Sequence, residues 1–125
     1  MDGKAKISVS LNIYGFSDGD DISTLLGRKP DRIADTQGSK PSHWELRAKP
    51  QARDSIEEHL SWLIHELSGY EEAITKIARN YDTNISIGVT YRDFNPEIIL
   101  EPDMLQAISK LNVKLWFDLY FLTEG

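Results

Sequence analysis

The sequence contains no cysteine, and this absence removes several classes of function at once. Disulfide frameworks, thiolate zinc sites, iron–sulfur clusters and cysteine nucleophiles all require that residue. No stretch approaches the roughly 18 apolar residues of a transmembrane helix. The N-terminus also lacks the apolar segment of a secretory signal. We therefore expect a cytoplasmic protein that does not enter a membrane.

Basic residues are also scarce, because 14 Lys and Arg face 20 Asp and Glu and give a net charge of −6. That balance disfavours nucleic acid and anionic membranes as partners. The chain has 125 residues, of which 40% are hydrophobic and 10% aromatic, so it is too apolar for a disordered chain. A single domain is expected over residues 1–125, with its core within about 7–121.

Periodicity in the apolar residues predicts the secondary structure. Alternation predicts strands at residues 7–13, 43–47, 85–91, 98–100 and 113–121. Helical spacing predicts helices at residues 21–26, 56–67, 71–79 and 102–111. The order β-α-β-α-α-β-β-α-β predicts an α+β fold, with one mixed or antiparallel sheet and helices packed on one face.

Local signals refine this prediction. Asp54 and Ser55 each precede a glutamate at the spacing of a capping box, while Gly27 and Asn112 suit the left-handed positions that end helices. Asp20 or Asp21 is expected to cap the first helix. Asn95-Pro96 predicts a turn that joins strands 85–91 and 98–100 as a hairpin.

Three tertiary expectations follow. Residues 28–43 are rich in prolines and turn formers, and the stretch from 28 to 53 is basic, so we expect an exposed basic loop at about 28–43. Trp44 is the only large apolar group near that loop and should be buried against Leu60, Leu63 or Leu67. The last strand has Trp116 and Tyr120 on the face opposite its apolar positions, which favours a place inside the sheet over one at its edge.

The sequence resembles the bacterial family catalogued as domain of unknown function 4279. The resemblance is carried by Tyr14-Gly15-Phe16, the segment from Asp21 to Pro30, Trp44 before a short strand, Ile56 to Leu60 with Leu63 and Leu67, Ile85-Ser-Ile87, and Leu115 to Tyr120. It implies no assigned activity. Through members that occur beside polymorphic toxin systems, the resemblance also implies an immunity role.

Candidate catalytic and metal sites are incomplete. His59 and His65 are six residues apart on one predicted helix, about 240° around its axis, so they cannot share a metal ion. The sequence shows no catalytic triad and no phosphate-binding glycine loop, and we expect no catalytic set, no metal and no cofactor. His43 and Arg47, near the basic loop, could form a ligand site with Asp118, which lies between large apolar groups.

Charge is the strongest functional signal. Residues 54 to 75 hold six acids and no Lys or Arg. We expect the partner-binding residues among the glutamates Glu57, Glu58, Glu66, Glu71 and Glu72, which would attract a basic protein. A solvated helix face is the ordinary alternative.

These observations leave two functional hypotheses. The first is a cytosolic protein-binding module, of the immunity type, that neutralises a basic toxin domain and is not an enzyme. The second is a small-ligand binder or an enzyme that uses the region of His43, Arg47 and Asp118. The oligomeric state stays open. A toxin gene beside the coding gene would favour the first hypothesis, and a pocket joining the three residues would favour the second.

Overall fold

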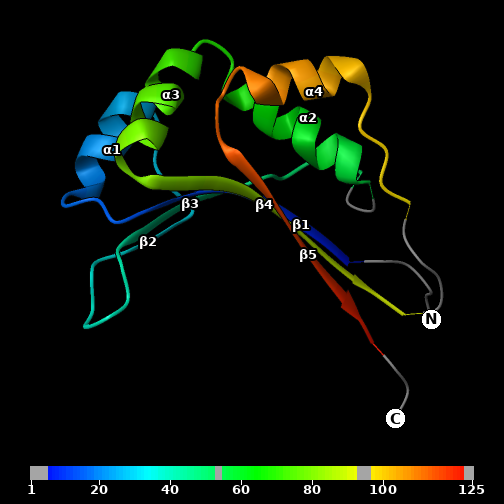
Figure 1. Ribbon diagram of the computed structural model, residues 1–125, viewed down its shortest axis with the longest axis horizontal. Coiled ribbons are helices and arrows are strands. Elements are labelled where there is room, and N and C mark those ends of the chain that lie inside the picture. The colour runs from blue at the N-terminus through cyan, green and yellow to red at the C-terminus, as the bar shows by residue number, and fades with distance from the viewer. Residues whose placement is uncertain (1–5, 53–54, 93–96, 123–125) are drawn as a thin grey trace.

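A computed structural model describes residues 6–52, 55–92 and 97–122, and in these the helices all lie on one face of the sheet (Figure 1). The elements in chain order are β1 (Lys6–Tyr14), α1 (Gly19–Leu26), β2 (Arg32–Ala34), β3 (His43–Arg47), α2 (Ile56–Glu66), α3 (Glu71–Asn80), β4 (Asp82–Tyr91), α4 (Pro102–Ser109) and β5 (Lys114–Phe121). The opposite face of the sheet, called the open face below, is not covered by any described helix. This arrangement confirms the α+β prediction.

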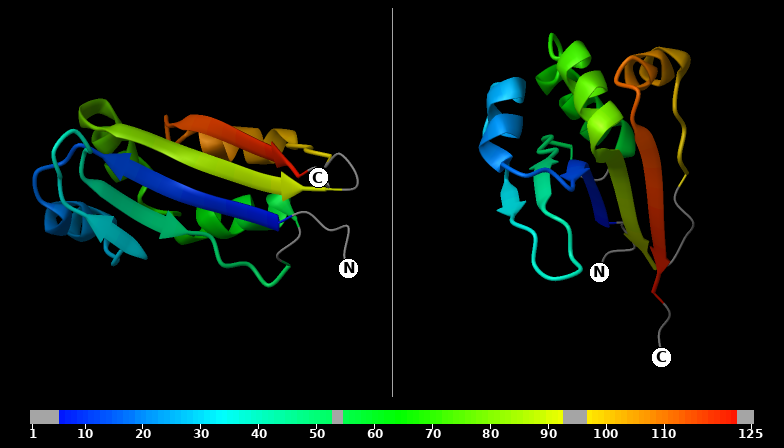
Figure 2. Two further views of the ribbon diagram at one scale, coloured as in Figure 1. Left: turned by 90° about the horizontal axis from the view of Figure 1, so that it is seen from below. Right: turned by 60° about the vertical axis from the view of Figure 1, so that its left-hand side comes forward.

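The sheet has the strand order β2-β3-β1-β4-β5. β1 pairs antiparallel with both β3 and β4, and β2 pairs antiparallel with β3. β5 pairs parallel with β4, so the sheet is mixed. Figure 2 shows how the long central strands twist and how β5 follows β4 along one side of the molecule.

Alternation along each strand separates the two faces of the sheet. On the helix side, the strands bury apolar residues such as Leu11, Leu46 and Ile87, which pack with Leu60 and Ile77 in one hydrophobic core. Trp44 is fully buried in the same core, as the sequence predicted, and its indole N–H donates to Ser23 Oγ at 3.1 Å.

The helix ends follow the sequence closely. Ser55 caps α2 by accepting a hydrogen bond from the amide of Glu58. Gly27 ends α1 at φ 65°, and Asn112 takes φ 58° in the turn between α4 and β5, as expected. The N-cap of α1 is Asp18, however, and not Asp20 or Asp21. The earlier acid sits at the extended position from which its carboxylate reaches the amide of Asp20.

The position of β5 contradicts the sequence-based expectation. β5 is the edge strand of the described sheet, with β4 as its neighbour. Apolar residues on both faces of a strand are typical of a central strand, but they are equally typical of an edge that a partner covers, and the sequence does not distinguish the two.

Two strand assignments also change. Within the predicted 28–43 loop, Arg32–Ala34 forms β2, and Ile33 packs so closely over Gly19 that a Cβ atom there would collide with it. Residues 98–100 do not form a strand, and Ile98 and Leu100 pack against the core. The order is therefore β-α-β-β-α-α-β-α-β. The predicted turn at Asn95-Pro96 and the proposed cap at Asp54 lie outside the described residues.

Candidate functional site

Polar side chains form rows across the open face, because the strand registers align them. Successive rows hold Glu45, Asn12, Asn84 and Lys114, then Arg47, Ser10, Ser86 and Trp116, then Ser8, Gly88 and Asp118. A row at the far end holds His43, Tyr14 and Asp82. The solvent-facing side of an antiparallel sheet is expected to carry polar residues. Several of the residues in these rows are nevertheless buried.

Asn12 is the centre of a buried hydrogen-bond network on this face. Its side-chain amide donates to Asn84 Oδ1 at 3.1 Å and to Ser86 Oγ at 3.0 Å, and it also lies 3.2 Å from Ser10 Oγ. The hydroxyls of Ser10 and Ser86 are themselves 3.1 Å apart. Because Ser10, Asn12 and Asn84 are each more than nine-tenths buried, these contacts hold the polar floor in one arrangement.

His43 joins this network from β3. Its Nε2 lies 2.8 Å from Asn12 Oδ1, which can only accept, so Nε2 carries the proton. The imidazole stacks on the Tyr14 ring at a centroid distance of 4.5 Å. Burial lowers the pKa of His43; the Glu45 carboxylate opposes this shift and the Arg32 guanidinium adds to it. Burial also raises the pKa of the Tyr14 phenol, with the nearby Glu45 and Asp82 charges adding to the effect. Both rings are therefore neutral at pH 7.

A hollow of about 580 Å³ lies over this polar floor. Its lining comprises Ser8, Ser10, Asn12, Tyr14, Pro41, Glu45, Asp82, Asn84, Ser86, Gly88, Trp116 and Asp118. The bare Gly88 leaves space between β1 and β5, and the exposed indole of Trp116 forms part of the wall. The hollow is within the usual size of small-ligand sites, which is about 300–1,000 Å³.

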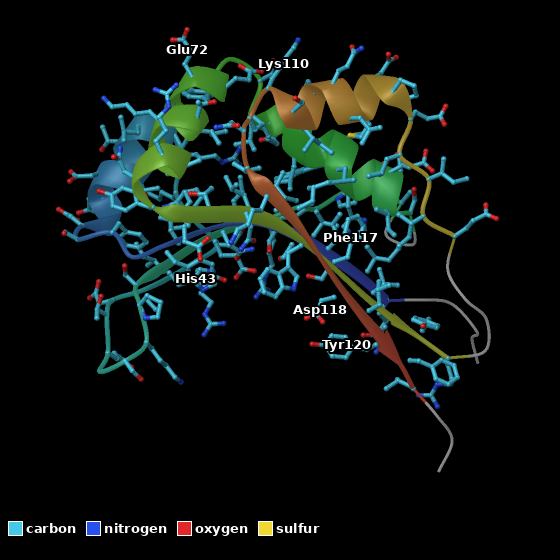
Figure 3. All side chains as sticks on the ribbon, viewed as in Figure 1. His43, Glu72, Lys110, Phe117, Asp118 and Tyr120 are labelled. Carbon is cyan, nitrogen blue, oxygen red and sulfur yellow. The ribbon has the colours of Figure 1, made fainter. Side chains whose placement is uncertain are left out.

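The residues of the predicted ligand site all lie on the open face, but only one of them lines the hollow. Figure 3 shows His43 and Asp118 below the sheet, on different strands. Asp118 lines the hollow and accepts a hydrogen bond from the Tyr120 hydroxyl at 2.7 Å. His43 stacks on the Tyr14 ring and does not line the hollow, and Arg47 Nε lies 3.3 Å from Glu45 Oε2. The hollow thus does not join the three residues, and its main polar groups come from β1 and β4.

Sequence reasoning missed those groups although a signal was present. Ser8, Ser10 and Asn12 alternate along β1, and Asn84 and Ser86 alternate along β4. Such small polar residues usually indicate a solvated face. Only the register shows that the two sets lie side by side and bond to each other.

The five predicted partner-binding glutamates are spread over two helices. Glu57 and Glu58 are exposed in the first turn of α2, whereas Glu66 near its end pairs with Arg28 at 2.8 Å. Glu71 accepts a hydrogen bond from the amide of Gly69. Together with Glu72 it lines a shallow surface hollow that also contains Lys76, Arg79 and Lys110. Figure 3 shows Glu72 and Lys110 above the helices. Local cations therefore offset part of the acidic charge.

The remaining histidines are also placed. His59 is buried, and its Nδ1–H donates to the carbonyl oxygen of Ser55 at 2.8 Å, whereas His65 is exposed. Within the part of the chain that the structure describes, no three metal-ligating side chains gather in one place. In the same residues, none of the helices has both the length and the apolar character needed to cross a membrane.

β5 and its surroundings expose the most apolar surface. Six large hydrophobic residues between 116 and 122 are exposed, among them Leu119 at 48% and Phe121 at 54%. Leu105 on α4 and Ile99 just before it are exposed as well. The β5 surface is defined here as Phe117, Leu119, Phe121 and Leu122 together with these two residues. Isolated exposed apolar residues are common, but a contiguous run on an edge strand is a candidate interaction site.

Comparison with known proteins identifies the family. Residues 5–122 match the family model described as "Domain of unknown function (DUF4279)", which covers nearly the whole chain, so the chain belongs to that family. No curated protein and no solved structure matches the chain. The assignment confirms the resemblance and carries no activity with it.

Proposed function

We propose that this member of the family is a protein-binding module that takes up an extended segment of a basic partner protein along the free edge of β5. The observation that carries the proposal is that, among the residues the structure describes, no strand pairs with the outer edge of β5. Proteins usually protect an edge strand by keeping it short or by placing Lys, Pro or a bulge on it. The opposite edge, β2, follows that rule with three residues.

β5 does not follow the rule. It is eight residues long, its only charged residues are Lys114 and Asp118, and Leu119 and Phe121 are half exposed. One row of backbone N–H and C=O groups on such an edge faces away from β4 and can pair with an added strand. Apolar side chains on the helix side of the edge, such as Leu119 and Phe121, would then be buried, which stabilises the complex.

The charge around the β5 surface favours a basic occupant. α4 leads into β5 through the short turn at 110–113, so the two elements run in opposite directions along the same side of the sheet (Figures 1 and 2). The exposed acids Glu97, Glu101 and Asp103 flank the exposed Ile99 and Leu105 of the β5 surface along the chain. Together with the net charge of −6, they provide a negative rim for an apolar docking strip.

In its specific form, the proposal is that the partner is a basic toxin domain and that the protein is a cytoplasmic, bacterial immunity protein. A module that covers a toxin needs a rigid docking surface and no catalytic residues of its own. The toxin-neutralising role predicts that a gene for a toxin with a basic catalytic domain lies beside the coding gene.

The test is a calorimetric titration of the protein with that catalytic domain. The double variant Leu119→Gln/Phe121→Gln should weaken binding by at least about tenfold, because buried apolar anchors dominate interface energy. Leu25→Gln is the matched control, since Leu25 is 44% exposed on α1 at the other end of the molecule. Equal affinities for the double variant and the wild type would contradict the proposal.

Analytical ultracentrifugation of the protein alone tests whether the edge of β5 is occupied by a second copy of this chain. We expect a monomer at micromolar concentration, because two copies would bring together surfaces with the same acidic rim. A stable dimer that the double variant abolishes would assign the edge to a second copy of this chain and overturn the proposal of a basic partner.

A further inference from the structure

The hollow on the open face is separate from the β5 surface and has its own chemistry. Its floor consists of hydroxyl and amide groups of Ser8, Ser10, Asn12, Asn84 and Ser86, and one wall is Trp116, which is 55% exposed. The network around Asn12 fixes the floor before any ligand arrives, so ordering these side chains costs little on binding.

The charges around the hollow exclude an anionic ligand. Glu45, Asp82 and Asp118 line it, and its described lining residues include no Lys, Arg or His. A phosphate or a carboxylate placed here would be repelled by the unbalanced negative charge, because three carboxylates face only the two nearby cations Arg47 and Lys114. Nucleotides and organic acids therefore do not fit this site.

A cationic ligand is also disfavoured, because two of the three carboxylates already have cationic partners. Arg47 Nε lies 3.3 Å from Glu45 Oε2, and Lys114 Nζ lies 3.0 Å from Asp82 Oδ1. The third carboxylate, Asp118, accepts the Tyr120 hydroxyl at 2.7 Å. Only Asp118 could pair with a new cation without displacing Arg47 or Lys114, and the Tyr120 hydroxyl competes for that carboxylate.

The remaining chemistry suits a neutral ligand with many hydroxyl groups and one apolar face. Carboxylate, amide and serine oxygens accept hydrogen bonds from ligand hydroxyls, and serine hydroxyls can also donate. The indole of Trp116 offers a flat surface on which C–H groups of a ring can pack. We propose that the open-face hollow binds a neutral saccharide, with its ring against Trp116 and its hydroxyls on the Asn12–Ser86 floor and the Asp118 carboxylate.

This inference does not rest on the proposed protein-binding function. Trp116 and Asp118 point to the open face, whereas Leu119 and Phe121 alternate to the helix side of β5. A variant can therefore alter one site while leaving the other intact, and the two tests can fail separately.

The experiment is an NMR titration of the isotope-labelled protein with maltotriose, cellotriose and chitotriose. Glucose 6-phosphate and arginine serve as the anionic and cationic comparators. We expect at least one neutral trisaccharide to cause saturable shifts at the Trp116 indole N–H and at the amides of residues 10–12 and 84–86. The two charged probes should bind at least about tenfold more weakly.

Trp116→Ala should weaken saccharide binding by about tenfold, the size expected for losing an aromatic platform. Phe121→Ala is the matched control, because Phe121 is an aromatic residue on the same strand and is 54% exposed but lies on the helix side and does not line the hollow. Asp118→Asn keeps the shape of the wall and should also weaken binding. Circular dichroism checks that each variant is folded.

Three results would overturn the proposal. One is the absence of saturable shifts with all three trisaccharides. Another is binding that Trp116→Ala and Asp118→Asn both leave unchanged. The last is preferential binding of arginine or glucose 6-phosphate, which would show that a charged group and not a polyhydroxylated ring recognises the hollow.

Discussion

His43 links the open face to pH. Burial lowers its pKa in the folded protein, against an ordinary value of 6.5, with Glu45 acting in the opposite direction and Arg32 in the same one. The unfolded chain then binds more protons than the folded one just below pH 6.5, so the free energy of unfolding falls as the pH drops through that window. The contribution of His43 to the free energy of unfolding is fully present above about pH 6.5.

The His43→Gln variant should lose this dependence, because glutamine can still donate to Asn12 but does not titrate in this range. Urea unfolding at about pH 7.5 and about pH 5 measures the effect, and the wild type should lose more stability than the variant. Burial alone would raise the pKa of Asp31, but its contacts with Lys49 and Arg47 outweigh burial and lower that pKa. Asp31 therefore changes the free energy of unfolding only below about pH 4, outside the compared range. Equal losses in both proteins would contradict the assignment.

At the scale of elements, β3 is held in the core by two apolar side chains, Leu46 and the larger Trp44. It has five residues, and Trp44 at its second position is fully buried and bonded to Ser23 on α1. Trp44→Ala should lower the free energy of unfolding by about 3–5 kcal/mol, since the cavity adds to the lost transfer energy. Ser23→Ala, which removes only the indole partner, should cost about 1 kcal/mol. Urea denaturation compares them, and a Trp44→Ala cost no larger than that of Ser23→Ala would show that packing of the ring matters little.

The elements also show what a sequence can and cannot specify. Long amphipathic helices with caps, such as α2 after Ser55, and long alternating strands such as β1 were predicted because their signals are local. β2 was missed because three residues are too few for a period to appear. The edge position of β5 and the pairing of Asn12 with Asn84 depend on strand order and register, which arise only when distant segments meet.

For the whole molecule, the remaining question is which part of the net charge of −6 guides a basic partner. Screening limits an exposed charge to about 8 Å at physiological ionic strength, so acids near the docking surface should dominate. The sequence placed the acidic surface on α2 and α3, where Glu66 is already paired with Arg28. Glu57, Glu58 and Glu72 remain as the exposed members of that set.

Two triple reversals to lysine separate the possibilities, because each changes the net charge by the same amount. Glu97→Lys/Glu101→Lys/Asp103→Lys acts around Ile99 and Leu105 of the β5 surface, and Glu57→Lys/Glu58→Lys/Glu72→Lys acts on α2 and α3. We expect the first to slow association with the basic domain by about tenfold or more and the second by clearly less, with both effects shrinking as salt is added. Stopped-flow association at several salt concentrations measures this, and thermal melting checks the fold. A larger effect of the helix variant would move the docking surface to α2 and α3, and equal effects would leave only the net charge to attract the partner.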